Sequence, residues 1–344
     1  MNRSNKATIG DVARVAGVSR STASYALSGK RAISLEVRER VDAAVRELGY
    51  TPNAGARALA TSQTHVLGLL VQFLEDEFAP AMLQYMLGVS DVARELGYDI
   101  LMVTDPDGAR ALERITESRM VDGVILLNVA DNDLRLPVLR SSLQPSALVG
   151  LPADCAGLDV FDLDFAEAGR VMVDRLADLG HRELVLVSQP EHVVERGGAY
   201  VWRLRDAAQA QAAVRGVELH AVYGEAQQPA VSRSLDAVLD RFPTATGLLV
   251  HNEAAAVALP AVLQARGLTS PTDLSVIGRY SDEFARTFAL PYSSIDSAPD
   301  RLGQMAVRQV VRRIEHPSPR EPHVVRFISP ELVDRGSIAP ARSN

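Results

Sequence analysis

The stretch GVSRSTASYALSG, residues 17–29, carries hydrogen-bonding side chains at helical spacing. Its polar residues, which would lie on the outer face of a helix, are Arg20, Ser21, Ser24 and Tyr25. Its apolar residues, which would lie on the inner face, are Ala23, Ala26 and Leu27. Such a helix can present its polar face to base edges in the major groove, where an arginine such as Arg20 can donate two hydrogen bonds to guanine O6 and N7. A small solvated helix on any globular protein would have the same composition, so this stretch alone leaves both interpretations open.

Neighbouring helical patterns would hold this stretch in place. Residues 8–16 begin with a capping residue, Thr8, and continue with apolar residues at helical spacing. Gly17 predicts the end of that helix, and Ser19 predicts the cap of the next one. A third helix is predicted within 34–49, from a serine cap to a terminal glycine. Two short helices joined by a turn that contains glycine form the helix-turn-helix pattern.

Hydroxyl side chains near the helix starts suit a second kind of contact. The candidates for hydrogen bonds to the nucleic-acid backbone are Thr8, Ser19, Thr22 and Ser24. Bonds to phosphate oxygens position a helix on a duplex without reading its sequence.

The charge of the chain is divided unevenly. Residues 1–62 hold ten Lys and Arg against five Asp and Glu, whereas the remainder holds 26 against 38. A basic head on an acidic body favours a polyanion as the partner of the head, although many basic surfaces are merely solvated. The single cysteine, Cys155, excludes an intrachain disulfide. We find neither a secretory signal nor a membrane-spanning stretch, and therefore expect a cytoplasmic protein without membrane contact.

From His65 onward, short apolar runs alternate with helical patterns. The runs are HVLGLLVQF, YDILMVT, VDGVILL, ELVLVSQ, TGLLVHN and LSVIGRY. Helical segments such as APAMLQYMLGVSDVARELG and EAGRVMVDRLADLG lie between them. This alternation is typical of a mostly parallel sheet covered by helices on both faces. The length of the region predicts two similar lobes.

The segments TIGDVARVAGVSRSTASYALSG and ERVDAAVRELGYTPNAGARALAT resemble the lactose-repressor (LacI/GalR) family of bacterial transcriptional regulators, and a looser similarity continues to PELVDRGSIA. The resemblance implies an N-terminal all-α helix-turn-helix headpiece and an α/β two-lobed periplasmic-binding-protein-like effector domain. The implied divisions are a headpiece at 1–49, a hinge helix or linker at 50–62, an effector-binding and dimerisation domain at 63–337 and a tail at 338–344. The implied lobes, joined by three crossovers, are about 63–160 with 290–325 and about 161–289 with 326–337.

The resemblance assigns base reading to Arg20, Ser21 and Tyr25. Family members usually have arginine where Tyr25 stands, so the operator need not have the common sequence. A homodimer on a pseudo-palindromic double-stranded operator is implied, because paired hinge helices need two chains.

The resemblance also assigns roles to the hinge. Leu59 matches the leucine that enters the minor groove at the operator centre, where such a wedge unstacks a base step and kinks the duplex. Asn53 is expected at the DNA backbone, and Ala56 and Arg57 at the minor groove. An ordinary linker is the alternative interpretation of 52–60.

A small-molecule effector, a sugar or related metabolite, is implied in the cleft between the lobes. Arg196 in ERGGAY, Asn252 in HNE and Asp164 are the expected contacts, with surface or capping roles as the alternative. Tyr280 in GRYS is a further candidate, because it stands where the family usually has an aspartate that binds ligand hydroxyls. APAM at 79–82 replaces an NPFF-like segment and removes aromatic rings that often stack on a sugar. We therefore expect a cleft with fewer hydrogen-bonding groups, and an effector that is bulkier, more apolar or anionic, or no effector.

Two other functions are compatible with parts of the pattern, and a third is not. A solute-binding module of the transport type would also have two lobes, but the helix-turn-helix argues against it. An enzyme is not expected, because the sequence has no glycine-rich phosphate loop, metal-spaced histidines or nucleophile elbow; the same features predict no metal and no cofactor. A regulator of the same fold without an inducer remains open. The favoured prediction is a dimeric repressor that binds operator DNA and a small-molecule effector.

Overall fold

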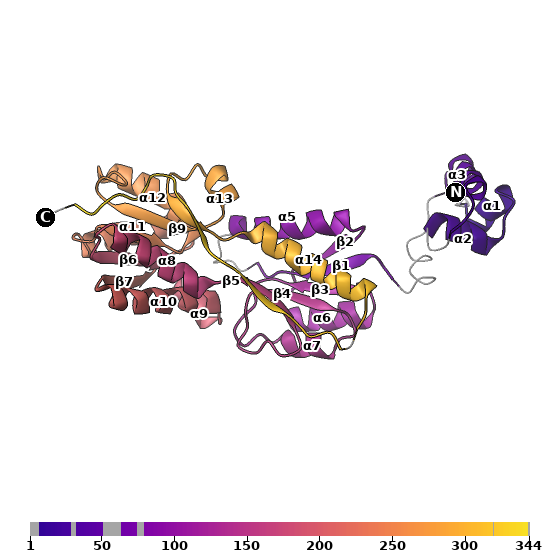
Figure 1. The fold of residues 1–344 in the computed structure, drawn as a ribbon, viewed down its shortest axis with the longest axis horizontal. Helices are drawn as coiled ribbons and strands as arrows, with labels where there is room; N and C mark the ends of the chain where they lie inside the picture. The colour runs from indigo at the N-terminus through magenta and orange to yellow at the C-terminus, as the bar shows by residue number, and fades with distance from the viewer. Residues whose placement is uncertain (1–6, 29–31, 51–62, 74–78, 319, 343–344) are drawn as a thin grey trace. The chain divides into compact units, whose positions relative to one another are not determined.

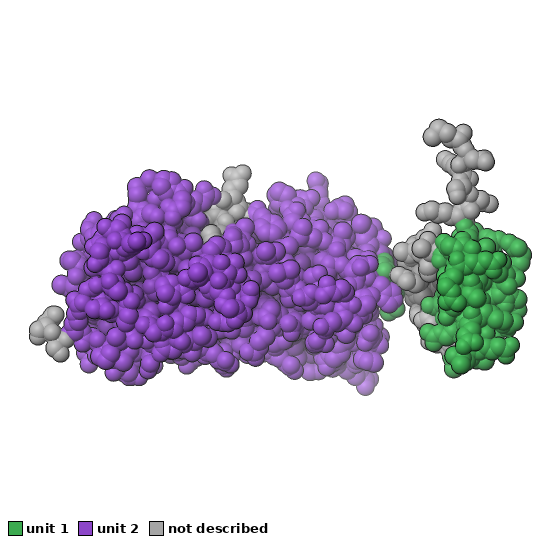
Figure 2. Space-filling model, turned by 90° about the horizontal axis from the view of Figure 1, so that it is seen from above, with its two compact units in different colours: residues 1–64 green, residues 65–344 purple. Residues whose placement is uncertain are grey.

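The computed structural model of the chain describes residues 7–28, 32–50, 63–73, 79–318 and 320–342. The chain divides into two compact units, Met1–Thr64 and His65–Asn344, which Figure 2 colours separately. The described part of the smaller unit is helical, and the larger unit contains two β-sheets with their helices (Figure 1). Within the described residues, no helix combines the length and the apolar character that crossing a bilayer requires.

Three helices surround a small apolar core in the first unit. They are α1 (Ile9–Val15), α2 (Arg20–Ser28) and α3 (Leu35–Leu48). The buried residues of this core are Val12, Ala16, Ala26, Val41 and Ala44. Ser19 and Ser34 each accept the backbone N–H of the residue three positions later, and Gly49 ends α3 in the left-handed region with φ of 54°. The predicted caps and helix ends are confirmed.

The first lobe of the larger unit is a six-stranded sheet in the order β11-β5-β4-β3-β1-β2, with all neighbours parallel. Its strands are β1 (Val66–Leu70), β2 (Asp99–Val103), β3 (Gly123–Leu126), β4 (Ser146–Val149), β5 (Asp159–Leu163) and β11 (Val325–Ile328). Its helices are α5 (Ala79–Glu95), α6 (Gly108–Glu117), α7 (Leu136–Ser141) and α14 (Pro299–Glu315).

The second lobe repeats this plan with the strand order β12-β10-β9-β8-β6-β7, and its edge strand β12 runs antiparallel to β10. Its strands are β6 (Glu183–Ser188), β7 (Glu218–Tyr223), β8 (Gly247–Val250), β9 (Ser275–Arg279), β10 (Ser293–Asp296) and β12 (Glu331–Val333). Its helices are α8 (Phe165–Asp178), α9 (Glu191–Glu195), α10 (Ala199–Arg215), α11 (Ala230–Arg241), α12 (Glu253–Ala265) and α13 (Asp282–Thr287).

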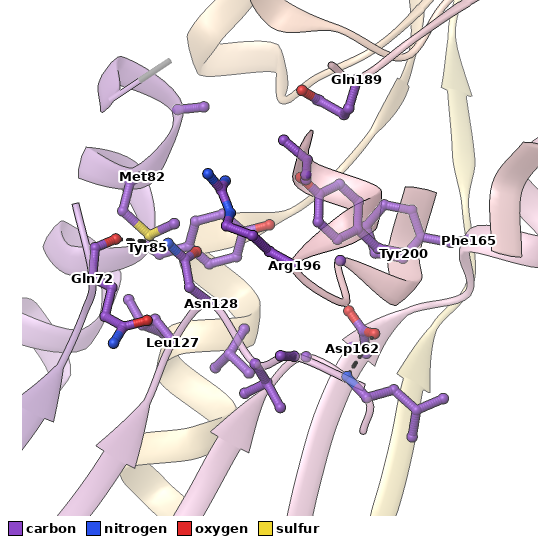
Figure 3. Close-up of a pocket in the computed structure, with 18 of the residues that line it drawn as sticks. Gln72, Met82, Tyr85, Leu127, Asn128, Asp162, Phe165, Gln189, Arg196 and Tyr200 are labelled. Carbon is purple, nitrogen blue, oxygen red and sulfur yellow. Dashed lines mark hydrogen bonds between the residues drawn. The ribbon is translucent and has the colours of Figure 1, made fainter. Parts of the chain in front are cut away.

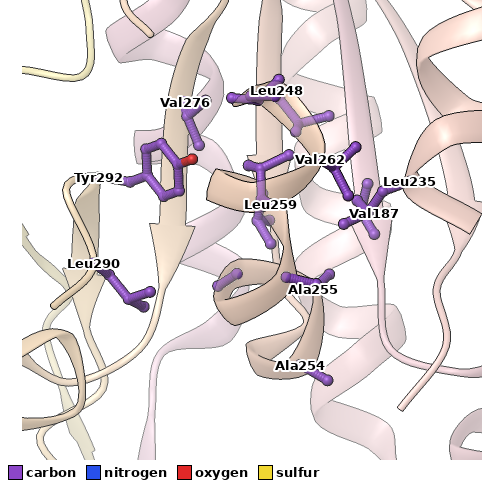
Figure 4. Packing of buried hydrophobic residues seen from close by; sticks show 14 of the residues in the cluster. Val187, Leu235, Leu248, Ala254, Ala255, Leu259, Val262, Val276, Leu290 and Tyr292 are labelled. Carbon is purple, nitrogen blue, oxygen red and sulfur yellow. The ribbon is translucent and has the colours of Figure 1, made fainter. Parts of the chain in front are cut away.

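Both faces of each sheet are buried under helices. On β8, Leu248 belongs to the cluster that includes α11 and α12, whereas the next residue, Leu249, belongs to the cluster with α8 and α10. Figure 4 shows Leu259 and Val262 of α12 among the residues of the first of these clusters. Because side chains alternate across a strand, a sheet covered on both faces needs apolar residues at successive positions. This requirement explains the short continuous apolar runs, and the predicted strands and helices of both lobes are confirmed.

The chain crosses between the lobes three times, after β5, after β10 and after β11. Each crossing falls a few residues later than the expected boundaries near 160, 290 and 325. Strand β10, placed in the first lobe by those boundaries, pairs with β9 in the second sheet. Strand β11, by contrast, pairs with β5 of the first lobe, although three of its four residues, 326–328, lie in the segment expected in the second lobe. The physical reason is that a strand joins a sheet along its whole length, and the apolar pattern does not tell which of two sheets it joins.

Candidate DNA-reading and effector sites

The outer face of α2 exposes the side chains expected to read bases. Arg20 and Ser21 are exposed, and Tyr25 keeps 40% of its surface accessible. Ala23 and Ala26 are buried inside the headpiece. The predicted division of α2 into an inner and an outer face is confirmed, and base reading by the outer face stays a prediction.

The hydroxyls expected to contact phosphate also hold the helix starts in place. Ser19 Oγ lies 2.8 Å from both Ser21 Oγ and Thr22 Oγ1, and it accepts the Thr22 N–H at 3.0 Å. Thr8 caps α1, and its hydroxyl donates to the carboxylate three residues later at 2.8 Å. Ser24 lies half-buried on α2. Capping is therefore one function of two of these hydroxyls, those of Thr8 and Ser19, and phosphate contact remains a prediction.

The predicted hinge falls on residues 51–62, which lie outside the described residues. Its expected DNA contacts are Asn53, Ala56, Arg57 and Leu59. Their roles stay predictions.

A cavity of about 230 Å³ lies between the two lobes of the larger unit (Figure 3). The first lobe contributes residues from the ends of β1 and β3 and from α5, among them Gln72, Met82, Tyr85, Leu127 and Asn128. The second lobe contributes residues that follow its strands or lie on α8 to α10, among them Phe165, Gln189, Arg196, Tyr200, Glu253 and Arg279. In open α/β sheets, ligands bind beyond the carboxyl ends of the strands, where these loops converge.

A buried polar chain forms the second-lobe side of the cavity. Arg279 at the end of β9 makes a buried ion pair with Glu253 at the start of α12. Gln189 Nε2 donates to the other Glu253 oxygen at 2.7 Å and to the His251 carbonyl at 2.9 Å. Three side chains that are far apart in the sequence are thereby fixed to one another at the strand ends.

Aromatic rings lie beside this polar chain. The Phe165 and Tyr200 ring centroids are 5.4 Å apart, and the Arg279 guanidinium carbon lies 5.7 Å from the Phe165 centroid. The His251 ring lies near both, with its centroid 5.9 Å from that of Phe165 in a tilted arrangement and 5.7 Å from that of Tyr200 in an edge-on one. Burial, aided by the nearby Arg279 charge, holds the pKa of His251 well below its usual range, so the imidazole is neutral. Burial likewise raises the pKa of Tyr85, whose hydroxyl stays protonated.

Asp162 at the end of β5 places a carboxyl in the cavity wall. Its oxygens accept the Leu163 N–H at 2.9 Å and the Leu151 N–H at 3.1 Å. Burial raises its pKa to about 7, although these hydrogen bonds and the Arg203 guanidinium 3.9 Å away act in the opposite direction. Near neutral pH this carboxyl is therefore close to half-protonated.

Contacts across the lobe boundary surround the cavity. The Asp131 N–H of the first lobe donates to the Gly197 carbonyl of the second at 2.8 Å. Gly197 has φ of 86°, and a Cβ there would lie 3.3 Å from the Asp131 nitrogen, so glycine suits both the turn and the close approach. Ser281, which caps α13, donates to Gln84 of α5. The lobes are thus held together through α5 as well as at Gly197.

Comparison with known proteins identifies the family. Residues 8–53 match the family model described as "Bacterial regulatory proteins, lacI family", and residues 173–338 match the one described as "Periplasmic binding protein-like domain". The chain belongs to the LacI family of bacterial regulatory proteins. This LacI-family protein has the predicted headpiece and periplasmic-binding-protein-like lobes, and it is a DNA-binding transcriptional regulator.

Its relatives cover nearly the whole chain. The HTH-type transcriptional regulator CelR of Thermobifida fusca is 29% identical over 323 residues, covering 91% of this chain and 94% of the relative. The solved CelR–cellobiose complex is 25% identical with a TM-score of 0.66, covering 96% of this chain and 99% of that one. A Lac repressor dimer bound to operator and an anti-inducer shares the fold, with a TM-score of 0.78 at 23% identity over 97% of this chain and 100% of that one.

The expected effector residues of this LacI-family protein lie either in the cavity lining or at the starts of helices. Arg196 lines the cavity. Asp164 and Asn252 instead cap α8 and α12 by accepting the backbone N–H groups of Glu167 and Ala255, and neither is among the cavity-lining residues. Capping, which was the alternative interpretation, is the role that their contacts show.

Tyr280 is packed in the interior of the second lobe. It is 1% exposed, its hydroxyl donates to the Tyr292 carbonyl at 3.1 Å, and its ring lies 5.8 Å from that of Phe284. Its expected place in the cleft is therefore wrong, because a neighbour at a strand end points the opposite way. Arg279, one residue earlier, reaches the cavity instead.

Sequence reasoning therefore missed residues that adjoin the ones it named. Asp162, Glu253 and Arg279 line the cavity, and they lie two, one and one positions from the named residues Asp164, Asn252 and Tyr280. The sequence signal that could have found these residues was their position at the end of a predicted strand. It locates the site to within two residues, but it does not tell which side chain turns inward.

The cavity also differs in character from the expected one. APAM contributes Ala79, Ala81 and Met82 to the lining, but other segments supply aromatic rings, including Phe73, Tyr85, Phe165 and Tyr200. Charged or amide side chains in the lining are Gln72, Asn128, Asp162, Gln189, Arg196, Glu253 and Arg279. The expectation of a cleft poor in hydrogen-bonding groups is wrong, because these groups come from parts of the chain that only the fold brings together.

Proposed function

We propose that this protein is a cytoplasmic repressor that binds a pseudo-palindromic operator as a homodimer and responds to a small molecule bound between its lobes. The observation that carries the proposal is the presence, in one chain, of a helix-turn-helix with a polar outer face and of a separate cavity enclosed by two lobes. Two of the similar solved structures support it, because one is a regulator with cellobiose and the other is a repressor dimer bound to operator. We infer no catalytic role.

In the proposed DNA complex, α2 lies in the major groove. Arg20, Ser21 and Tyr25 read base edges, and the hydroxyls of Thr8, Ser19, Thr22 and Ser24, together with Asn53, contact the backbone. Ala56, Arg57 and Leu59 meet the minor groove at the operator centre. Two half-sites related by the dimer axis would then be read by two copies of α2.

The proposed response to effector is a change in the equilibrium between open and closed lobes. A ligand in the cavity would touch both lobes, and it would favour closure because it loses its contacts with one lobe when the lobes separate. The bond from Asp131 to Gly197 and the bond from Ser281 to Gln84 would be broken in an open form. The ligand can shift operator affinity only by the ratio of its affinities for the two forms.

Selection of bound duplexes from a random pool tests the DNA half of the proposal. The expected result is an enriched palindrome to which the Arg20→Ala variant binds at least about fivefold more weakly, because a bidentate arginine–guanine contact discriminates by about 1–3 kcal/mol. Arg233→Ala on α11, an exposed arginine of the second lobe, is the matched control and should leave binding unchanged. No enriched sequence at moderate salt, where non-specific binding is weak, would contradict the proposal.

Adding metabolites to the selected complex tests the effector half. A compound that alters the operator affinity of the parent protein but not that of the Arg196→Ala variant would support a ligand-gated regulator whose effector site is the cavity. A palindrome that no compound disturbs would instead favour a regulator of the same fold without an inducer.

A further inference from the structure

The carboxylates of the cavity are already engaged by the protein. The two Asp162 oxygens accept backbone N–H groups at 2.9 Å and 3.1 Å. One Glu253 oxygen accepts from Arg279 and the other from Gln189. Each of the four oxygens thus holds a protein donor, which reduces the capacity of this site to accept hydrogen bonds from ligand hydroxyls.

Arg279 has donors left over. A guanidinium carries five N–H groups, and within the described residues Arg279 makes one hydrogen bond, from Nη2 to Glu253. Its Nε is buried with no partner among those residues. A buried donor without an acceptor costs free energy, so an acceptor placed beside this guanidinium would be favoured. Arg196 brings a second guanidinium to the same cavity (Figure 3).

The charges of the lining do not oppose an anion. The Glu253 charge is matched by the Arg279 guanidinium with which it pairs. Asp162 is 5% exposed, and burial raises its pKa to about 7, so it is less negative at neutral pH than an ordinary carboxylate. The charged groups nearest to Asp162 are Arg203 at 3.9 Å and Asp164 on the same strand end.

The apolar walls and the volume limit the body of the ligand. Met82, Tyr85 and Leu127 lie on the first-lobe side, and Phe165 and Tyr200 on the second-lobe side. An apolar cavity of about 150 Å³ accommodates benzene. A cavity of about 230 Å³ therefore suits one six-membered ring with a small substituent.

We propose that the effector is a small organic acid, a carboxylate carried on a single six-membered ring, whose carboxylate meets the guanidinium groups of Arg279 and Arg196. The ring would lie against Phe165 and Tyr200. This inference rests on the proposed function, since it names the ligand class of the same cavity. It also distinguishes this protein from a receptor of neutral sugars, whose many hydroxyls need acceptors, because all four carboxylate oxygens of Asp162 and Glu253 already accept from the protein.

Calorimetric titration of the whole chain tests the inference. The acid probes are benzoate and cyclohexanecarboxylate, their neutral amides of similar shape are benzamide and cyclohexanecarboxamide, and the neutral sugars are ribose and cellobiose. At least one acid should bind at least tenfold more tightly than its amide, because hydrogen bonds to charged groups contribute more than neutral ones. The same acid should alter binding to the selected operator.

A paired substitution locates the bound acid. Arg279→Gln together with Glu253→Gln removes both members of the ion pair, so that no unpaired charge is left buried. Acid binding should fall at least tenfold, whereas the amide should be little affected. Arg205→Gln is the matched control, because Arg205 contacts Asp206 and Tyr223 outside the cavity. Should the double variant fail to fold, Arg196→Gln provides the same comparison.

The outcomes separate this inference from the proposed function. Equal binding of acid and amide, tighter binding of ribose or cellobiose, or acid binding that neither Arg279 nor Arg196 substitution weakens would each overturn the organic-acid assignment. A neutral ligand that still alters operator binding would leave the proposed function standing. No binding by any acid would also overturn the assignment. Operator selection with the same preparation would then test the proposed DNA-binding function independently of the ligand.

Discussion

Arg203 Nη1 of the second lobe lies 3.9 Å from Asp162 Oδ2 of the first, so one guanidinium joins the two lobes beside the cavity. Arg203 Nη2 lies at the same distance from Asp131, which also donates its backbone N–H to Gly197. Asp131 and Asp162 belong to the first lobe, and Arg203 belongs to α10 of the second. Separation of the lobes would break all of these contacts together.

Arg203→Met is therefore expected to weaken lobe closure. A partly exposed ion pair contributes up to about 1 kcal/mol, so ligand affinity should fall about fivefold for whichever probe binds the cavity. Titration calorimetry gives the affinity, and small-angle scattering gives the lobe separation. Arg205→Met on the same helix should change neither, and equal losses in the two variants would rule out an inter-lobe role for Arg203.

The Arg279–Glu253 pair should respond differently to single and double substitution. Arg279→Met leaves a buried glutamate without its partner and should reduce the free energy of unfolding by about 3–5 kcal/mol. Arg279→Met with Glu253→Gln should recover most of that loss, because no unpaired charge remains buried. Urea unfolding of the parent, of Arg279→Met, of Glu253→Gln and of the double variant measures these values, and a purely additive double variant would argue against the pair.

The Asp162 carboxyl should make stability depend on pH. Its folded pKa of about 7 exceeds the ordinary value, so the folded state binds the proton more tightly than the unfolded state. Its contribution is therefore most favourable below about pH 4 and is lost as the pH rises through 7, by roughly 4 kcal/mol at most. Asp162→Asn should flatten this part of the profile. Thermal unfolding between pH 5 and about 8 provides the test, and an unchanged profile would place the pKa elsewhere.

Tyr25→Arg should change the operator at one position of each half-site. Arginine reads guanine through O6 and N7, so guanine should be enriched where the parent protein selects another base. Positions read by Arg20 and Ser21 should stay as they were. Parallel selections on the two proteins provide the comparison, and identical consensus sequences would mean that Tyr25 does not contact a base.

Leu59→Ala should weaken operator binding more than binding to unrelated DNA. The proposed wedge acts only where the operator centre is kinked, whereas non-specific affinity depends on phosphate contacts. A loss of about tenfold or more on the operator, with little change on random duplex, is expected in fluorescence-anisotropy titrations. Equal losses on both DNAs would argue against the wedge.

The amino-acid sequence by itself determined the local features of this protein. Caps at Ser19 and Ser34, the helix end at Gly49 and the two faces of α2 follow from side-chain chemistry within a few residues of each position. The alternating apolar runs and helical patterns were enough to predict two α/β lobes, because the strands of a sheet buried on both faces have continuous apolar sequences.

Only the tertiary structure decided which residues meet in the cavity. Arg279, Glu253 and Gln189 lie at the carboxyl ends of three different strands, and their contact depends on the order β9-β8-β6, which no local pattern encodes. The turn at each strand end also decides which of two neighbours faces the cleft, and that choice put Arg279 rather than Tyr280 there. The sheet assignments of β10 and β11 likewise arise from long-range pairing. Local chemistry therefore specified the elements, and packing between distant segments specified the site.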